Sequence, residues 1–255
     1  MMNNEDRYSF LEQTMIEHGF HLDPVKINQL IRYYDMVVEK NQVMNLTNIT
    51  EFQEFVYKHL LDSIYLGKYM DLTGNKKMID IGTGAGFPGI PIKIVYTKSS
   101  ITLLDSLNKR VKFLSEVIAA LNLHDIEAVH ARAEELARNK EYRESYDLAV
   151  SRAVANLSTL TEITLPFLKT GGIFVSYKSL KGIQELEEAG KAIKLLGGDS
   201  EQIDIKEFKI EAHYDHEQEK NTEILDRNFI MIQKIKNTPN KYPRKPGTPF
   251  KEPIK

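Results

Sequence analysis

The spacing of apolar residues changes near residue 70 of the 255-residue chain. Before that point it repeats every three or four residues, which is the period of an amphipathic helix. Asp23-Pro24 is a helix-start signal, and the apolar positions after it share one helical face: Ile27, Leu30, Ile31, Tyr34, Val37 and Val38. Thr50 is predicted to cap another helix, whose apolar positions are Phe52, Phe55, Val56, Leu60 and Ile64. Residues 1–70 are therefore predicted to form a helical cap.

Beyond residue 70, short apolar runs alternate with amphipathic helices. The predicted strands are 78–81, 101–104, 126–130, 147–150 and 172–177, and a helix is predicted over 107–121. This β-α-β-α order predicts an α/β, Rossmann-like domain over residues 71–236, with a mostly parallel sheet and helices on both faces. Two later runs, 202–210 and 228–235, are predicted to form an antiparallel hairpin at the sheet edge.

Residues 237–255 form a proline-rich tail with five of the nine prolines in the protein, so the pattern predicts neither a helix nor an inner strand but an extended or disordered segment. Residues 233–255 carry seven basic side chains and one acidic one, a net charge of +6. The total charge is -2, so the rest of the chain carries -8. This asymmetry indicates local contact with an anionic partner, with a solvated terminus as the alternative. We expect truncation after Lys236 to weaken binding of this anionic partner and to leave any other binding site of the chain intact.

The composition limits the class of protein. The chain has no cysteine, which excludes disulfides and cysteine-ligated zinc. Its polar N-terminus does not resemble a signal peptide, and no apolar stretch approaches the roughly 20 residues that cross a bilayer. We expect a cytoplasmic monomer that requires no metal and has no membrane partner.

A glycine-rich turn follows the first predicted strand, with the sequence Asp80-Ile81-Gly82-Thr83-Gly84-Ala85-Gly86-Phe87-Pro88-Gly89. Glycine lets the backbone turn sharply and lets a ligand approach main-chain atoms without a Cβ in the way. The frame from Gly82 is G-x-G-x-G with Asp80 two residues earlier, which is the methyltransferase version. Its acid can help to hold the amino-acid part of the cofactor. The frame from Gly84 to Gly89 instead matches the dinucleotide pattern G-x-G-x-x-G, and a tight turn that binds nothing is a third reading.

Polar residues follow the next three predicted strands. Asp105 ends the second strand, where a carboxylate either binds both hydroxyls of a ribose or caps the following helix. Ala133 and Glu134 follow the third strand, in a loop that meets an adenine edge or simply begins a helix. Arg152 follows the fourth strand and either faces the crevice, holding a substrate or cofactor group, or forms a surface ion pair.

The chain lacks the residues for two kinds of base methylation. It has no cysteine for the thiolate adduct of pyrimidine carbon-5 methylation, and neither Asn-Pro-Pro-Tyr nor Asp-Pro-Pro-Tyr for exocyclic amino groups. The remaining acceptor is one that is already nucleophilic, such as guanine nitrogen-7. For such an acceptor, proximity and orientation can supply about 7–11 kcal/mol of the barrier.

His59 and Asp62 lie three apart on a predicted helix, where they form either a functional pair or part of the core.

Together these residues resemble one family, the small-subunit ribosomal RNA methyltransferase G family (RsmG, also called GidB). The segments that carry the resemblance are Asn45 to Thr47, His59 to Ile64, Asp80 to Ile92, Leu103 to Arg110, Ala131 to Glu135, Ser151 to Ala155 and Tyr242 to Pro249. The likeness is close over residues 40–178 and at the end of the chain, and looser over 180–225. It implies a class I S-adenosylmethionine-dependent methyltransferase fold.

The resemblance also implies an activity. A methyl group would pass from S-adenosyl-L-methionine to nitrogen-7 of one guanine in the 530 loop of 16S rRNA (the guanine 527 region), within the small ribosomal subunit, leaving S-adenosyl-L-homocysteine. Pattern and resemblance together give a predicted cofactor-binding set: Asp80, Gly82, Gly84, Gly86, Phe87, Asp105, Ala133, Glu134 and Arg152, the last also catalytic. The predicted RNA-facing set is His59, Asp62, Lys178, Arg244 and Lys245.

Three other functions remain open at this point. The Gly84 frame and Asp105 also suit an NAD-dependent oxidoreductase. A non-catalytic ribosome-assembly factor would retain the same cofactor fold. A methyltransferase acting on a small molecule would have no obvious use for the basic tail.

Overall fold

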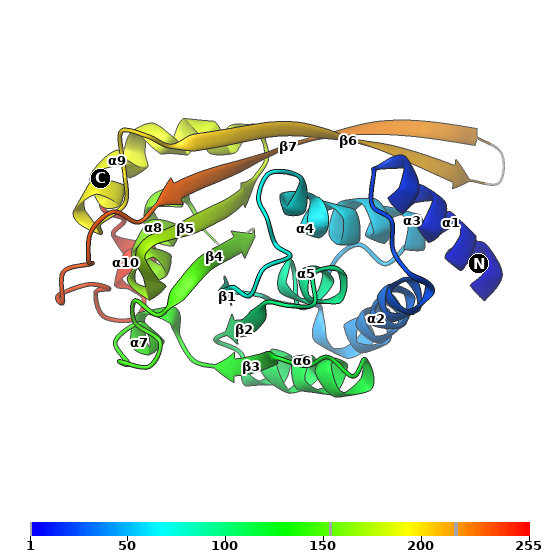
Figure 1. Cartoon of the computed structure of the whole chain (residues 1–255), viewed down its shortest axis with the longest axis horizontal. Helices are drawn as coiled ribbons and strands as arrows, with labels where there is room; N and C mark the ends of the chain where they lie inside the picture. The colour runs from blue at the N-terminus through cyan, green and yellow to red at the C-terminus, as the bar shows by residue number, and fades with distance from the viewer. Residues whose placement is uncertain (1, 153–154, 217–218) are drawn as a thin grey trace.

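The computed structural model describes residues 2–152, 155–216 and 219–255 (Figure 1). It is built on a seven-stranded sheet in the order β3-β2-β1-β4-β5-β7-β6. The parallel strands are β1 (Lys77–Ile81), β2 (Ser100–Asp105), β3 (Ile126–His130), β4 (Tyr146–Arg152) and β5 (Leu168–Lys178). At one edge, β7 (Glu219–Gln233) runs antiparallel to both β5 and β6 (Asp204–His216). The predicted mostly parallel α/β sheet is thus confirmed, including its antiparallel edge.

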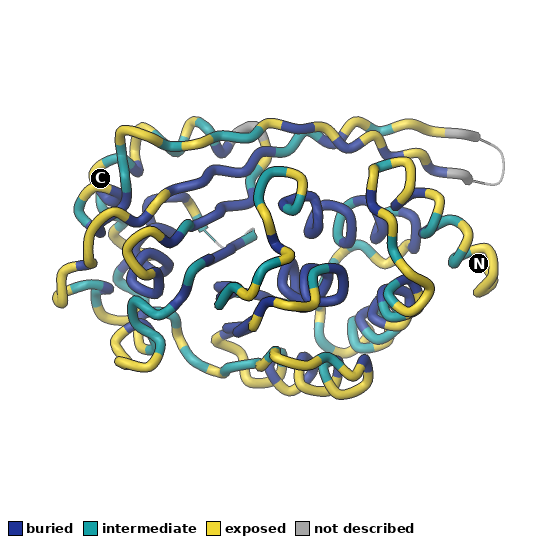
Figure 2. The backbone as a smooth tube through the Cα atoms, viewed as in Figure 1, coloured by how far each residue is buried: buried dark blue, intermediate teal, exposed yellow. Residues whose placement is uncertain are grey.

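Helices cover both faces of the sheet. The helices α5 (Gly89–Val95) and α6 (Asn108–Ala120) lie on one face, and α8 (Leu157–Thr164) and α9 (Glu185–Leu195) lie on the other (Figure 1). The neighbouring residues Met78 and Ile79 of β1 accordingly belong to two different hydrophobic clusters, one on each face. The central strands are buried along their length (Figure 2), as a parallel sheet covered on both sides requires.

The first 70 residues form helices that pack on the α5 face. They are α1 (Asn4–Glu17), α2 (Pro24–Met44), α3 (Phe52–Phe55), a π-helical turn over Val56–Leu61, α4 (Asp62–Ile64) and a 3₁₀ turn over Tyr65–Lys68. Asp23 caps α2, because its carboxylate accepts a hydrogen bond from the Lys26 amide at 3.0 Å. The predicted Thr50 cap is wrong: the residue before α3 is Glu51, whose side chain accepts from the Glu54 amide at 2.8 Å. These helices share one hydrophobic cluster with α5 and α6.

The β6–β7 hairpin is longer than the pattern predicted. It continues past the sheet and over the N-terminal helices (Figure 1). There Lys58 forms an ion pair with Glu223 at 3.0 Å, and the Tyr57 and Tyr214 rings meet edge to face at 5.6 Å. Side-chain contacts of this kind hold the part of the hairpin that lies beyond its pairing with β5.

In the described ranges, no helix is both long and apolar enough to span a bilayer.

The proline-rich tail folds back on the protein, which corrects the prediction of an extended or disordered segment without a helix. Arg143 donates to the carbonyls of Thr238 at 2.7 Å and Tyr242 at 3.0 Å, so the tail runs along a fixed path. It then forms the short helix α10 (Thr248–Lys251), with Pro249 in its first turn. A proline is tolerated there because first-turn amides have no partner within the helix.

Candidate active site

The polar residues singled out in the sequence gather at the carboxyl ends of the parallel strands. The order in which the parallel strands follow one another reverses between β1 and β4, and ligands of such sheets bind outside the carboxyl ends at that point. Two cavities lie along this edge. We call the one of about 110 Å³ over β1, β2 and β3 the glycine-turn cavity, and the one of about 470 Å³ beside β4, β5 and β7 the cationic cavity.

The glycine-turn cavity brings together four of the predicted cofactor residues: Gly82, Asp105, Ala133 and Glu134. They follow three different strands, with Ala133 opening the short helix α7 (Ala133–Leu136). Ile81, Leu104 and Ile163 supply apolar walls. The cavity is smaller than the ~300–1,000 Å³ common for ligand pockets, so it suits one flat ring better than a whole nucleotide.

The glycines of the turn have different roles. Gly84 has a φ of 63°, and a Cβ built on it would meet no protein atom within 4 Å, so its main chain is open to a ligand. Gly86 has a φ of 112°, but a Cβ there would lie 2.6 Å from Ile90 and 2.9 Å from the Tyr33 hydroxyl. Gly86 therefore allows close packing behind the turn rather than ligand approach.

Asp80 lies under the turn and is fully buried. Its Oδ2 accepts from the Thr83 hydroxyl at 2.7 Å and from the Gly89 amide at 2.9 Å, which ties the two ends of the turn together. Its Oδ1 has no hydrogen-bond partner among the described residues. Burial raises the pKa of Asp80 to about 7, although these two hydrogen bonds oppose the shift. Asp80 thus supports the turn from below, and its side chain lines neither cavity, while the predicted hold on the amino-acid part of the cofactor stays a prediction.

Asp105 lies at the end of β2 but does not cap α6, whose N-cap residue is Leu107, and its suggested contact with a ribose stays a prediction. Its Oδ1 accepts from the Leu107 amide at 2.8 Å, just before α6, and its Oδ2 accepts from the Gly84 amide at 3.0 Å. Arg110 Nη1 lies 3.4 Å from the same Oδ2, and a carboxylate offers about four acceptor positions, so one position remains for a ribose hydroxyl. The open main chain at Gly84, this carboxylate and the small apolar cavity beside them fit the adenosine part of S-adenosylmethionine.

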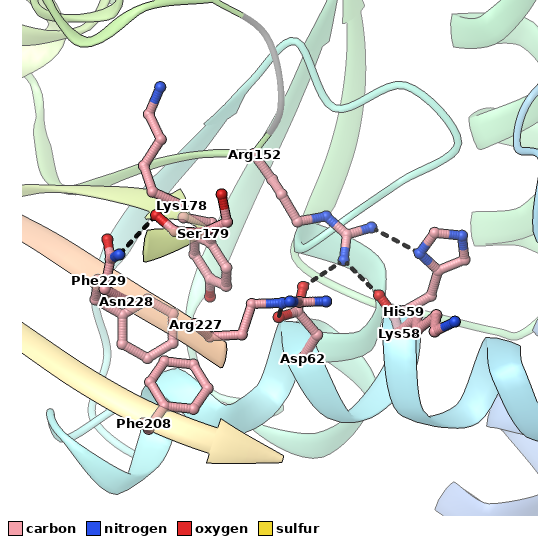
Figure 3. A pocket seen from close by; sticks show the side chains of 11 residues that line it. Lys58, His59, Asp62, Arg152, Lys178, Ser179, Phe208, Arg227, Asn228 and Phe229 are labelled. Atoms are coloured by element: carbon pink, nitrogen blue, oxygen red, sulfur yellow. Dashed lines mark hydrogen bonds and ion pairs between the residues drawn. The ribbon is translucent and has the colours of Figure 1, made fainter. Parts of the chain in front are cut away.

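The cationic cavity is organised by Asp62, which lies between two arginines (Figure 3). Arg152 Nη1 donates to Asp62 Oδ2 at 2.8 Å, and Arg227 Nε donates to Oδ1 at 2.9 Å. Two guanidinium groups share one carboxylate, so the group keeps a net positive charge. Arg152 therefore faces a crevice, as predicted, but it lines the cationic cavity and not the glycine-turn cavity.

His59 fixes the other side of Arg152. Arg152 Nη2 lies 3.1 Å from His59 Nδ1, and His59 Nε2 lies 2.8 Å from the Thr47 hydroxyl. A guanidinium only donates, so Nδ1 must accept and the proton must reside on Nε2. Burial lowers the pKa of His59 to about 3, and the charge of Arg152 adds to the shift. His59 is thus a neutral group that positions Arg152. His59 and Asp62 both contact the Arg152 guanidinium, so they share a face, as their spacing suggested.

Phe87 packs behind this arrangement. Its ring stacks on His59 with centroids 4.4 Å apart, and the Arg152 guanidinium carbon lies 4.8 Å from its centroid. Phe87 is buried and lines neither cavity, and its predicted contact with the cofactor stays a prediction. It connects the glycine turn to the arginine.

Further cations and aromatic rings complete the cationic cavity. Lys178, which was predicted, lines it while paired with Glu185 at 2.8 Å, and Lys58 was not predicted. Arg227, Phe208 and Phe229 were missed as well, because they come from the β6–β7 hairpin and no local motif marks them. The alternation of strand residues predicted a hairpin but not which side chains face a cavity. Ala153 and Val154, part of the motif around Arg152, lie outside the described residues.

The two predicted RNA residues of the tail lie in different surroundings. Arg244 donates to the buried carboxylate of Glu162 through Nη2 at 2.6 Å, so its charge is used within the protein. Lys245 is exposed. The tail also borders the glycine-turn cavity through Phe250, a contact that the sequence pattern did not predict.

The fold and the glycine-turn cavity define a Rossmann-like class I S-adenosylmethionine-dependent methyltransferase fold. Among solved structures, the chain resembles an S-adenosylmethionine-dependent O-methyltransferase from Thermotoga maritima, with a TM-score of 0.53 and 14% identity over 80% of this chain and 72% of that one. It also resembles a precorrin 8w decarboxylase from Methanobacterium thermoautotrophicum, with a TM-score of 0.51 and 16% identity over 67% and 88% of the two chains. At such identities the likeness concerns the fold alone.

The chain belongs to the rRNA small subunit methyltransferase G family, whose profile matches residues 26–238. Curated relatives named Ribosomal RNA small subunit methyltransferase G include those of Alkaliphilus metalliredigens and Bacillus subtilis, 46% and 45% identical, each over 94% of this chain and 95% of the relative. That of Clostridium novyi is 46% identical over 99% of this chain and all of the relative. Membership confirms the resemblance and favours methyl transfer over the nicotinamide-dependent alternative.

Proposed function

We propose that this protein transfers a methyl group from S-adenosylmethionine to nitrogen-7 of one guanine in the 530 loop of 16S rRNA. The observation that carries the proposal is the pairing of two cavities on one sheet edge. One has the carboxylate and open glycine turn that suit an adenosine, and the other has cations and aromatic rings that suit a nucleotide. Full-length similarity to curated small-subunit rRNA methyltransferases supports the substrate class.

The acidic and basic groups of the cationic cavity support an acceptor that needs no deprotonation. The Asp62 carboxylate is held by two arginines, and both ring nitrogens of His59 have partners. Neither group is therefore free to remove a proton. Guanine nitrogen-7 has a free lone pair at neutral pH, which makes a general base unnecessary.

The cofactor supplies the methyl group on a sulfonium, and the protein residues position the acceptor. Phe208 and Phe229 offer apolar faces for an unstacked base, as single-stranded RNA loops permit. Arg152 and Arg227, which share one carboxylate, provide the positive charge for its phosphates. Proximity and orientation of this kind can supply about 7–11 kcal/mol of the barrier.

The test uses purified protein, radiolabelled S-adenosylmethionine and small subunits from cells that lack this modification. Label is expected in one 16S rRNA fragment, and chain cleavage by borohydride and aniline, which is specific for 7-methylguanine, is expected at one position. Label that resists this cleavage would refute the nitrogen-7 assignment. A parallel reaction with naked 16S rRNA shows whether the assembled subunit is required.

A further inference from the structure

The C-terminal tail contributes an aromatic wall to the glycine-turn cavity. Phe250 lines this cavity together with Gly82, Asp105, Ala133 and Glu134. It lies in α10, more than a hundred residues after the last of these in the chain. The side chain is 47% exposed, so a face of the ring remains available beside the cavity.

The segment that carries Phe250 is held in place by two contacts with α8. Before it, Arg244 forms its ion pair with Glu162 of α8, a carboxylate whose side chain is 1% exposed. Next to it, the Pro249 carbonyl accepts from the Thr159 hydroxyl of α8 at 2.9 Å. A partly buried ion pair and a buried hydrogen bond fix the backbone on which Phe250 is carried.

A second link joins the tail directly to the cavity wall. The Gly247 amide donates to Glu134 Oε1 at 2.8 Å, and Glu134 is 3% exposed. Glu134 is one of the residues that the family resemblance assigns to the adenine side of the cofactor. The buried carboxylate thus connects the tail with the loop after β3, so both form one wall.

We propose that Phe250 is a cofactor-positioning residue whose ring packs on the adenine of S-adenosylmethionine, so that the tail completes the cofactor site. This rests on the proposed function, because it takes the glycine-turn cavity to be the adenosine site. The chemistry matches: the cavity is small, its remaining walls include Ile81, Leu104 and Ile163, and a flat base gains from contact with an aromatic face. This role of the tail replaces the expectation that truncation after Lys236 leaves other binding sites, here the cofactor site, intact.

The first experiment measures the dissociation constant of S-adenosylhomocysteine by calorimetry. Phe250→Ala is expected to weaken binding on the order of tenfold, the scale of one aromatic–base contact. Phe250→Tyr, which keeps the ring, is expected to stay within about threefold of the wild type. Lys251→Ala changes the next, exposed residue and serves as the matched control with wild-type affinity. Unchanged affinity in Phe250→Ala would overturn the inference.

The same variants identify the part of the ligand that Phe250 contacts. If the ring packs on adenine, Phe250→Ala should weaken adenosine by the same factor as S-adenosylhomocysteine. A loss seen with S-adenosylhomocysteine but not with adenosine would place the contact elsewhere and contradict the proposal. Failure of the wild type to bind S-adenosylhomocysteine would instead remove the cofactor assignment, and with it both the proposed function and this inference.

A spectroscopic readout tests stacking without relying on lost affinity. The chain contains no tryptophan, so Phe250→Trp introduces a unique indole. Its fluorescence should change saturably as S-adenosylhomocysteine is added. Val43→Trp places an indole at an exposed position of α2, where no change is expected. If the fluorescence of Phe250→Trp stays as constant as that of Val43→Trp when S-adenosylhomocysteine is added, the ring at position 250 does not face the ligand.

Discussion

Asp62→Asn removes the carboxylate that joins Arg152 and Arg227 in the cationic cavity. Asp62 is 4% exposed, and both arginines bind it at hydrogen-bonding distance. Loss of one partner from a buried ion pair costs about 3–5 kcal/mol, because charge is left uncompensated. Here two guanidinium groups would face one neutral amide. Their side chains are 14% and 25% exposed, so water relieves part of the repulsion, and we expect a loss of about 3 kcal/mol.

The free energy of unfolding, measured in urea, tests this value. A double mutant that adds Arg227→Gln leaves a single cation beside the amide, so its loss should fall short of the sum of the single losses by about 1–3 kcal/mol. Asp35→Asn is the control, because Asp35 forms a partly exposed ion pair with Arg7 worth at most about 1 kcal/mol. If Asp62→Asn costs no more than this control, the carboxylate does not organise the cavity as we describe.

Three further outcomes follow from the same geometry. Arg152→Ala should keep the fold, because Asp62 retains its ion pair with Arg227. It should lower the rate of methyl transfer more than about tenfold, because an oriented cation is lost. A normal rate would show that Arg152 is not part of the site. Gly84→Ala should cost about 1–2 kcal/mol of stability because of its positive φ, and it should sharply weaken cofactor binding. Gly86→Ala introduces clashes inside the protein and should lower the melting temperature more than Gly84→Ala does. A larger loss of melting temperature in Gly84→Ala would contradict the assigned roles. His59 has a folded-state pKa of about 3, below its ordinary 6.5, so at this residue the unfolded chain binds one more proton between these values. Its contribution to stability therefore falls as pH drops through that range, opposite in sign to the contribution of Asp80. His59→Gln should remove this slope of about 1.4 kcal/mol per pH unit in urea titrations from pH 4 to 7, and an unchanged slope would argue against a buried neutral imidazole.

Local patterns predicted most of the fold and the centre of the site. The glycine turn, Asp105 and Arg152 follow strands, and the carboxyl ends of parallel strands must meet at one edge, so their proximity could be expected. His59 and Asp62 were found because helical spacing placed them on one face. The role of each of these residues could not be predicted from local patterns. Asp80 is buried under its own turn, which depends on how α5 packs on the sheet.

Apart from Lys58, which is next to His59 in the chain, the residues that were missed come from distant segments. Arg227 contacts Asp62 across 165 positions of sequence, and its partner depends on the register of a long hairpin. Phe250 reaches the glycine-turn cavity only because carbonyls of the tail bind Arg138 and Arg143 along the way. The proline pattern was misjudged because Pro249 occupies the first turn of a helix, where its missing amide proton costs nothing.

The most direct test of the account is nucleotide-resolution mapping of 16S rRNA from cells with and without this gene. One 7-methylguanine in the 530 loop should be present with the gene, absent without it, and restored by the wild-type chain but not by Arg152→Ala. An unchanged methylation map in cells that lack the gene would contradict the account.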